Sequence, residues 1–157
     1  AVTEALSEAV SDTTALAAAE LVGLSDRAFE ITLDYIKTRE QFDRPIGSFQ
    51  VLQHRAVDLN IMREVAQAGV REVLARMQHE TDPGVRKRLA SRAKARAVTA
   101  AKKITRDAIQ LHGAVGYTDE FDIGLYLNRA LVLSAWLGDD TYHRRMWFKA
   151  REQEGAA

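Results

Sequence analysis

Helix-breaking residues are scarce in this chain, and their placement constrains its fold more than any other feature. The 157 residues include two prolines, Pro45 and Pro83, and each lies between two long stretches with helical spacing of apolar side chains. Proline interrupts a helix because it lacks a backbone N–H and clashes with the preceding turn. The alternation of apolar and polar residues that is typical of strands is nearly absent. The sequence therefore predicts an all-α fold built from long helices.

The apolar spacing predicts three long helices followed by two shorter ones. The long helices cover about residues 13–37, 49–79 and 83–112. One short helix begins at Asp119 or Glu120, and Gly138 separates it from a last helix. Side chains that accept hydrogen bonds from free amides favour helix starts. Caps are therefore expected at Ser11, Asp12 or Thr13, at Ser48, at Asp82, and at Asp139 or Asp140.

Short connections between such helices favour an up-and-down four-helix bundle with a short C-terminal helical extension. A chain of 157 residues is long enough for one domain with a sizeable core. We expect residues 1–12 to form a flexible N-terminal segment, residues 13–152 to form the bundle, and residues 153–157 to be a frayed tail.

The third predicted helix has one apolar face and one basic face. Ala93, Ala97 and Ala101 recur every four residues, which favours the close approach of another helix. The basic side chains are expected to be solvated and balanced by acids elsewhere in the chain. These side chains belong to Arg86, Lys87, Arg88, Arg92, Lys94, Arg96, Lys102 and Lys103.

The composition argues against several classes of partner and site. Lys plus Arg and Asp plus Glu both number 22, so the zero net charge favours neither nucleic acid nor an anionic membrane surface. No apolar run approaches the roughly 20 residues of a membrane span. Cysteine is absent and the four histidines are scattered, so no metal site is expected. The lack of cysteine and of a basic N-terminal region favours a cytoplasmic location.

Two glycines three residues apart, Gly113 and Gly116, follow the third predicted helix. Glycine adopts left-handed backbone angles at helix ends without steric cost, and the free amides of such a turn can face an anion. A plain helix stop is the alternative interpretation. His112, beside this turn, is the best lone candidate for a residue that contacts a ligand. Motifs of serine hydrolases and phosphate loops are absent.

Two segments together resemble the C-terminal helical domain of acyl-CoA dehydrogenases. The family's Arg-x-x-Phe-Gly-x-x-Ile segment is similar to Arg39-Glu40-Gln41-Phe42-Asp43-Arg44-Pro45-Ile46, which Gln50 follows. The family's Gln-x-x-Gly-Gly-x-Gly-(Tyr/Phe)-x-x-Glu segment is similar to Gln110-Leu111-His112-Gly113-Ala114-Val115-Gly116-Tyr117-Thr118-Asp119-Glu120. The resemblance covers about residues 13–152, and the occurrence of both motifs in order makes it specific.

The resemblance implies a cofactor role. In the family, these segments hold the adenine and pyrophosphate end of an FAD that belongs to a neighbouring protomer. Arg39 would pair with the pyrophosphate, since a guanidinium is a planar charged donor. The other residues implied are Gln41 and Phe42 beside the adenosine, Gln50 near the adenine, and Gln110 with the amides of Gly113 and Ala114 on the diphosphate or ribitol side. Alternatively, Arg39 and Gln110 only tie helix ends together.

The chain departs from the family pattern at three positions. Asp43 stands where the family usually has Gly, and Ala114 replaces the second Gly of the glycine turn. The family's catalytic Glu, which precedes a Gly, is matched by Leu137. An alkyl side chain cannot abstract the α-proton of an acyl-CoA. An alternative family position on the first helix, near Thr13, holds no acid either. We therefore assign no catalytic residue and expect the isolated chain to be inactive.

Three functions are compatible with these residues. In the first, the chain is a domain or subunit of an acyl-CoA dehydrogenase-type flavoprotein that acts on an acyl-CoA substrate. In the second, it is a base-lacking partner subunit within a heteromer. In the third, it is a helical interaction module without flavin. A homo- or hetero-oligomer built on helix faces is expected, because large apolar surfaces seldom remain uncovered.

Overall fold

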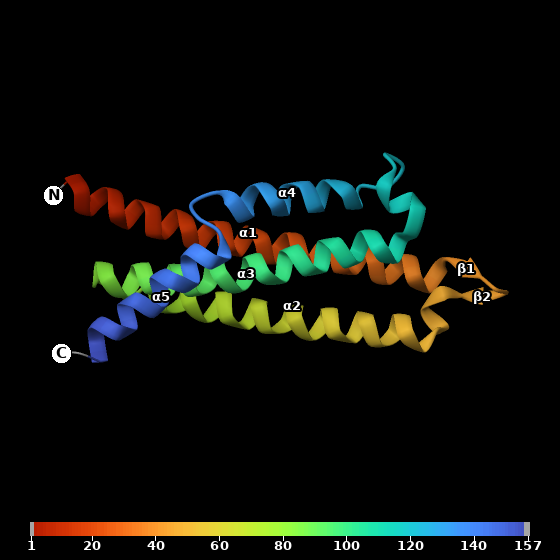
Figure 1. The fold of residues 1–157 in the computed structure, drawn as a ribbon, viewed down its shortest axis with the longest axis horizontal. Coiled ribbons are helices and arrows are strands. Elements are labelled where there is room, and N and C mark those ends of the chain that lie inside the picture. The colour runs from red at the N-terminus through yellow and green to blue at the C-terminus, as the bar shows by residue number, and fades with distance from the viewer. Residues whose placement is uncertain (1, 156–157) are drawn as a thin grey trace.

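The computed structural model describes residues 2–155, and the side chains of residues 2–149 (Figure 1). Three long helices come first: α1 (Val2–Thr38), α2 (Gln50–Met77) and α3 (Pro83–His112). The shorter helices are α4 (Ile123–Ala135) and α5 (Asp140–Gly155). A two-stranded hairpin, β1 (Glu40–Gln41) and β2 (Arg44–Pro45), and the 3-10 turn η1 (Ile46–Ser48) join α1 to α2, while the 3-10 turn η2 (Gly113–Tyr117) follows α3.

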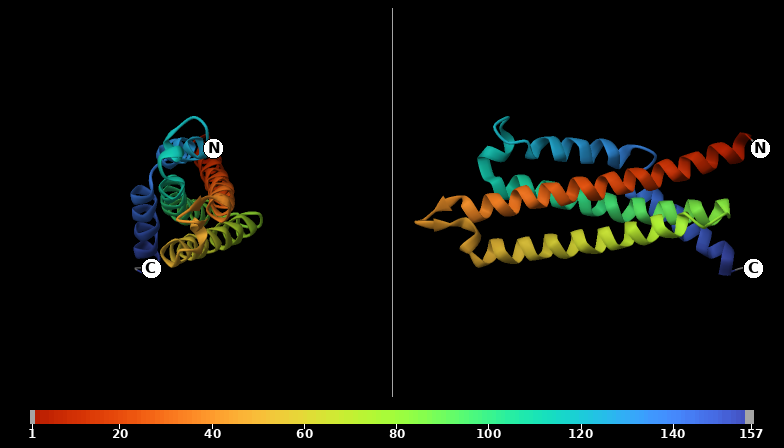
Figure 2. Two further views of the ribbon diagram at one scale, coloured as in Figure 1. Left: turned by 90° about the vertical axis from the view of Figure 1, so that its right-hand side faces the viewer. Right: turned by 180° about the vertical axis from the view of Figure 1, so that it is seen from behind.

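Successive helices α1 to α4 run in alternating directions, and α5 crosses the outer side of α3 (Figure 2). The predicted all-α, up-and-down bundle with a C-terminal extension is therefore confirmed. Within residues 2–155, no helix combines the length and apolarity needed to cross a membrane.

The first helix begins at Val2, so the predicted start at Ser11, Asp12 or Thr13 is wrong. Side chains that suit a helix cap are used inside the helix instead. The Ser11 hydroxyl donates to the Ser7 carbonyl at 2.9 Å, and the Thr14 hydroxyl donates to the Val10 carbonyl at 2.7 Å. Such bonds to the preceding turn satisfy a polar side chain without ending the helix.

The other predicted boundaries differ by a few residues. Ser48 belongs to η1 and does not cap α2, whose first flanking residue is Phe49 in an extended conformation. The predicted cap of α3 is confirmed, because Asp82 Oδ1 accepts from the Val85 amide at 2.9 Å. Asp139 Oδ1 likewise accepts from the Tyr142 amide at 2.7 Å at the start of α5. Of the predicted frayed tail, residues 153–155 are helical in α5, and residues 156–157 lie outside the described residues.

Helix α3 lies at the centre of the bundle and supplies much of its core. Ala93, Ala97 and Ala101 are buried against α1, α2 and α4, as the four-residue spacing predicted. Its basic face is not uniformly solvated, however. Lys94 is fully buried, and the Arg86 side chain is 14% exposed. The prediction of a solvated basic face is therefore wrong for these two residues.

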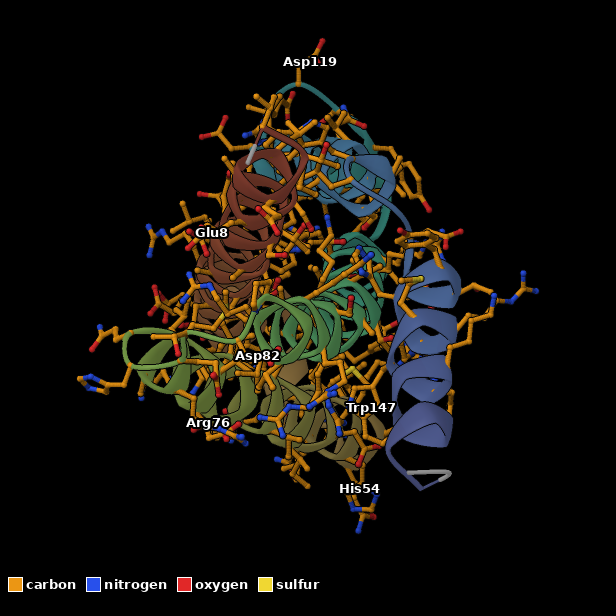
Figure 3. The ribbon with its side chains drawn as sticks, turned by 90° about the vertical axis from the view of Figure 1, so that its left-hand side faces the viewer. Glu8, His54, Arg76, Asp82, Asp119 and Trp147 are labelled. Atoms are coloured by element: carbon orange, nitrogen blue, oxygen red, sulfur yellow. The ribbon has the colours of Figure 1, made fainter. Side chains whose placement is uncertain are left out.

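Arg86 ties together the end of the bundle that carries the α2–α3 turn. Its guanidinium donates to the carbonyls of Met77 (2.6 Å) and Glu80 (2.8 Å) and pairs with Asp12 of α1 at 2.5 Å. Figure 3 views this end, with Asp82 at the turn and Glu8 on α1. One side chain thus holds three segments in register.

Replacement of Arg86 by Ala is expected to lower the free energy of unfolding by about 2–3 kcal/mol, since hydrogen bonds to charged groups are worth about 1.5–3 kcal/mol each and the carbonyls lose their donor. Urea unfolding followed by circular dichroism measures this loss. The matched control is Arg76→Ala, which removes an exposed pair with Glu72 at 3.3 Å and should cost less than about 1 kcal/mol. Equal losses in both variants would contradict the assigned role.

Candidate functional site

The hairpin between α1 and α2 has an unusual turn. Strands β1 and β2 are antiparallel, with Gln41 opposite Arg44, so Phe42 and Asp43 form a two-residue turn. Both residues are left-handed, with φ of 56° and 61°. Such turns require positive φ at both positions, which glycine, asparagine and aspartate tolerate best. Asp43 therefore fits the position where the family has Gly, whereas Phe42 holds a strained conformation.

The turn presents an aromatic side chain to the surface. The Phe42 side chain is 85% exposed and contacts Phe49 edge to face, with ring centroids 6.0 Å apart. The Arg44 guanidinium lies 4.1 Å from the centre of the Phe49 ring. A strained backbone at an exposed aromatic residue is typical of a functional surface.

The glycine turn closes α3 at the same end of the bundle (Figure 1). Gly113 has φ of 66°, as predicted for a glycine at a helix end, and nothing lies within 4 Å of the place a Cβ would take. Gly116 is required for another reason. A Cβ there would lie 2.8 Å from the Ile109 carbonyl oxygen, so the turn folds back onto α3. Gly113 is thus exposed, with its amide donating to the Gln110 carbonyl, and Gly116 is buried.

Tyr35 joins the hairpin to the glycine turn. Its backbone carbonyl accepts from the Arg39 amide at 2.8 Å, its hydroxyl donates to the His112 carbonyl at 3.2 Å, and its ring stacks on the His112 ring with centroids 4.3 Å apart. The two motif segments, about 70 residues apart in the chain, are therefore linked through one residue, by its backbone to Arg39 and by its side chain to His112. No motif in the sequence marks Tyr35 as a functional residue.

The predicted cofactor residues all belong to these segments. Arg39 precedes β1, and its carbonyl accepts from the Ile46 amide at 2.8 Å. The Gln41 side chain donates to the Glu40 carbonyl at 2.8 Å. Arg39, Gln41, Phe42, Gln50, Gln110, Gly113 and Ala114 are all solvent-exposed in the structure.

His112 lies beneath the glycine turn and not on its surface. The ring is 3% exposed, and Nδ1 is 2.7 Å from the Ala108 carbonyl oxygen, so Nδ1 carries the proton. Burial lowers the pKa of His112, against a smaller opposing effect of the Ala108 carbonyl. A neutral, stacked imidazole fits a role in packing the turn better than a direct ligand contact.

Leu137 lies away from the hairpin, in the turn between α4 and α5 (Figure 1). It has φ of 60° and precedes Gly138 with φ of 104°. Its side chain lines a pocket of about 290 Å³ together with Leu6 and Val10 of α1 and Ser91 of α3. Among the described residues that line this pocket there is no carboxylate.

Substitution of Gly116 tests whether the packed part of the turn is needed. Gly116→Ala should lower the free energy of unfolding by about 1–3 kcal/mol, because the added methyl overpacks against Ile109. Gly113→Ala has open space, but alanine rarely adopts φ of 66° with ψ of −143°, so this variant should cost about 1–3 kcal/mol through backbone strain alone. Thermal unfolding of the two variants measures these costs. An unchanged free energy of unfolding in Gly116→Ala would contradict the packing assigned to that glycine.

Comparisons with known proteins agree with this architecture. The family profile described as "Acyl-CoA dehydrogenase, C-terminal domain" matches residues 4–150. The acyl-CoA dehydrogenase IpdE2 of Mycolicibacterium smegmatis is 39% identical over 132 residues, which are 83% of this chain and 40% of that protein. The chain thus spans less than half the length of this relative.

Solved structures show the same fold. Butyryl-CoA dehydrogenase from Megasphaera elsdenii superposes with a TM-score of 0.84 at 23% identity, covering 90% of this chain and 36% of that chain. The ChsE4–ChsE5 complex from Mycobacterium tuberculosis contains a chain that superposes with a TM-score of 0.80 at 26% identity, covering 87% of this chain and 36% of that one. Profile, relative and fold agree, and this chain belongs to the acyl-CoA dehydrogenase family, in which it corresponds to the C-terminal helical domain.

Proposed function

We propose that this chain is the C-terminal helical part of an acyl-CoA dehydrogenase-type flavoprotein and that the hairpin and the glycine turn hold the adenine and pyrophosphate end of an FAD from a neighbouring protomer. The family is FAD-dependent. The observation that carries the proposal is the meeting of Arg39 and the glycine turn through Tyr35 at one end of the bundle. It brings a guanidinium-bearing residue, a donor that a diphosphate needs, and the exposed glycine turn to one end of the bundle.

The exposed residues of this end fit the parts of a dinucleotide. Arg39 is a charged donor for the diphosphate, and the exposed turn at Gly113 and Ala114 leaves room for the diphosphate to approach the backbone. Phe42 offers an exposed ring for the adenine, with Gln41, Gln50 and Gln110 as hydrogen-bonding partners. Bound FAD would supply the acceptor for the hydride removed from the acyl-CoA, while these residues only bind and orient its distal end.

Leu137 favours a supporting role over a catalytic one. The α-proton of an acyl-CoA needs a positioned base, and the described lining of the pocket beside Leu137 offers none. The chain then contributes cofactor contacts and assembly surface, and the base comes from a partner subunit in a heteromer or from another part of a longer chain. The solved complex of ChsE4 with ChsE5, which resembles this chain, supports an assembly with two kinds of subunit.

Exposed apolar side chains support assembly through helix faces. On α4 and just beyond it, Val132 is 60% exposed, Trp136 48% and Leu131 40%. Surfaces of this kind on neighbouring positions usually mark an interface. We therefore infer a homo- or hetero-oligomer in which this face is covered.

Flavin absorbance of the purified assembly tests the proposal. The chain, produced with the polypeptide that completes it, should be yellow, with flavin absorbance in the same gel-filtration peak as the protein and a mass above that of the monomer. A colourless assembly that stays colourless after incubation with FAD would favour the helical interaction module without flavin. A monomeric mass would remove the assembly role.

A further inference from the structure

A buried lysine holds the C-terminal end of α4. Lys94, in the middle of α3, has no exposed surface, and its ammonium donates to the carbonyls of Leu133 at 2.6 Å and Trp136 at 2.7 Å. Among the described side chains no carboxylate pairs with it. Its partners are the last carbonyls of a helix, which form the negative end of the helix dipole.

Burial lowers the pKa of Lys94 to about 8. The ammonium therefore stays mostly protonated at neutral pH, and a charge is retained in the core by carbonyl groups alone. A buried cation is costly, and carbonyl acceptors offset part of that cost. A leucine or methionine would fill the same space without that cost, so the two carbonyl contacts explain why a lysine fits here.

The opposite side of the α4–α5 turn is held by the same face of α3. His143, the fourth residue of α5, is 3% exposed, and its Nδ1 lies 3.2 Å from the hydroxyl of Ser91. Ser91 precedes Lys94 by one helical turn, so both residues face the α4–α5 connection. Burial and the nearby Lys94 charge lower the pKa of His143, while the backbone of Leu137 and Gly138 and the Asp139 carboxylate oppose that shift.

The backbone between the contacts made by Lys94 and the contact made by His143 is strained. Leu137 is left-handed at φ of 60°, a conformation that an L-residue with a large side chain rarely adopts. Such a conformation persists only where the surrounding structure imposes it. Lys94 on one side and His143 on the other impose it here, and the turn directs Leu137 into the pocket between α1 and α3.

We propose that Lys94 is a positioning residue for residue 137: by binding the terminal carbonyls of α4, its ammonium fixes the α4–α5 turn so that the side chain at 137 forms a wall of the pocket. Any function of this pocket wall rests on the proposed function, but the positioning of residue 137 by Lys94 does not. The turn thus holds the side chain at position 137 in one place, although leucine has no acid–base chemistry.

Hydrogen exchange of the assembly measures the positioning directly. In Lys94→Met, the amides of Trp136, Gly138 and His143, which donate to Val132, Ala135 and Asp139, should exchange at least about tenfold faster, while amides in the middle of α2 keep their rates. Lys103→Met, which removes an exposed ammonium paired with Asp107 on the same helix, is the control and should change neither set. If Lys94→Met does not fold, Lys94→Gln, which retains a neutral donor, is measured in the same way.

A second measurement separates positioning from general core packing. Removal of the Lys94 charge should raise the pKa of His143, read from its ring proton signals and assigned with His143→Gln, whereas Lys103→Met should leave it unchanged. Unchanged exchange in the turn, or an equal rise in α2 and the turn, would overturn the proposal, as would an unchanged His143 pKa. Neither measurement uses flavin, so a flavin-free assembly would refute the proposed function and leave this result intact.

Discussion

Supplied with FAD and a series of acyl-CoA thioesters, this chain alone is expected to form no α,β-unsaturated product. Removal of the α-proton needs a positioned base, whose contribution is about 10²–10⁴-fold in rate. The family resemblance matches Leu137 to the catalytic carboxylate, and the described lining of its pocket contains no acid. A dye-linked assay of electron transfer, together with chromatography of the thioesters, measures the product. Turnover at a rate within tenfold of that of a complete acyl-CoA dehydrogenase would contradict this account.

The same position can be tested within the full assembly. If a partner supplies the base, Leu137→Glu should leave the rate of acyl-CoA oxidation nearly unchanged, and so should the apolar control Leu137→Met. A rise of about 10²-fold or more in Leu137→Glu alone would mean that this chain forms its own reacting pocket and lacks only the base.

Arg39→Ala is expected to reduce flavin retention by the assembly about 10- to 150-fold. In the proposed function the guanidinium would make a charge-assisted contact with the diphosphate, worth about 1.5–3 kcal/mol, and each 1.4 kcal/mol is a factor of ten in affinity. Flavin content per complex after gel filtration reports the loss. The control is Arg27→Ala in α1, where an exposed arginine pairs with Glu30 at 3.0 Å. Equal flavin content in all three proteins would remove the cofactor role of Arg39.

The long helices and their order were predictable because apolar side chains keep helical spacing in the stretches that the two prolines separate. The caps at Asp82 and Asp139 were predictable for the same local reason, since each side chain binds an amide three residues away. The start of α1 was not, because Ser11 and Thr14 bind carbonyls of the preceding turn and so do not end the helix. The presence of a hydroxyl in the sequence does not reveal whether it caps a helix or donates to a carbonyl of the preceding turn.

The candidate site could be predicted in part. The two motifs identified the segments, but the sequence could not reveal Tyr35, whose hydroxyl reaches across 77 positions of the chain. Lys94 was placed on a solvated face by its charge. Its spacing from Ala90 and Ala97, which are four residues before and three after it and are both buried, was a signal that it lies on the core face. The prediction relied on the charge of Lys94 and not on its position on the helix. Its carbonyl partners at the end of α4 could not be known before the fold.

Retention of FAD compared with FMN tests the central claim most directly, because FMN has the flavin ring without the adenine and the second phosphate. The assembly that contains this chain, stripped of flavin and dialysed against equal concentrations of either molecule, should retain FAD at least about tenfold more tightly than FMN, as expected from one charge-assisted phosphate contact. Arg39→Ala should remove most of that preference while leaving FMN binding unchanged. Equal affinity for FAD and FMN in the wild-type assembly would contradict the assignment of the hairpin and the glycine turn to the adenine and pyrophosphate end.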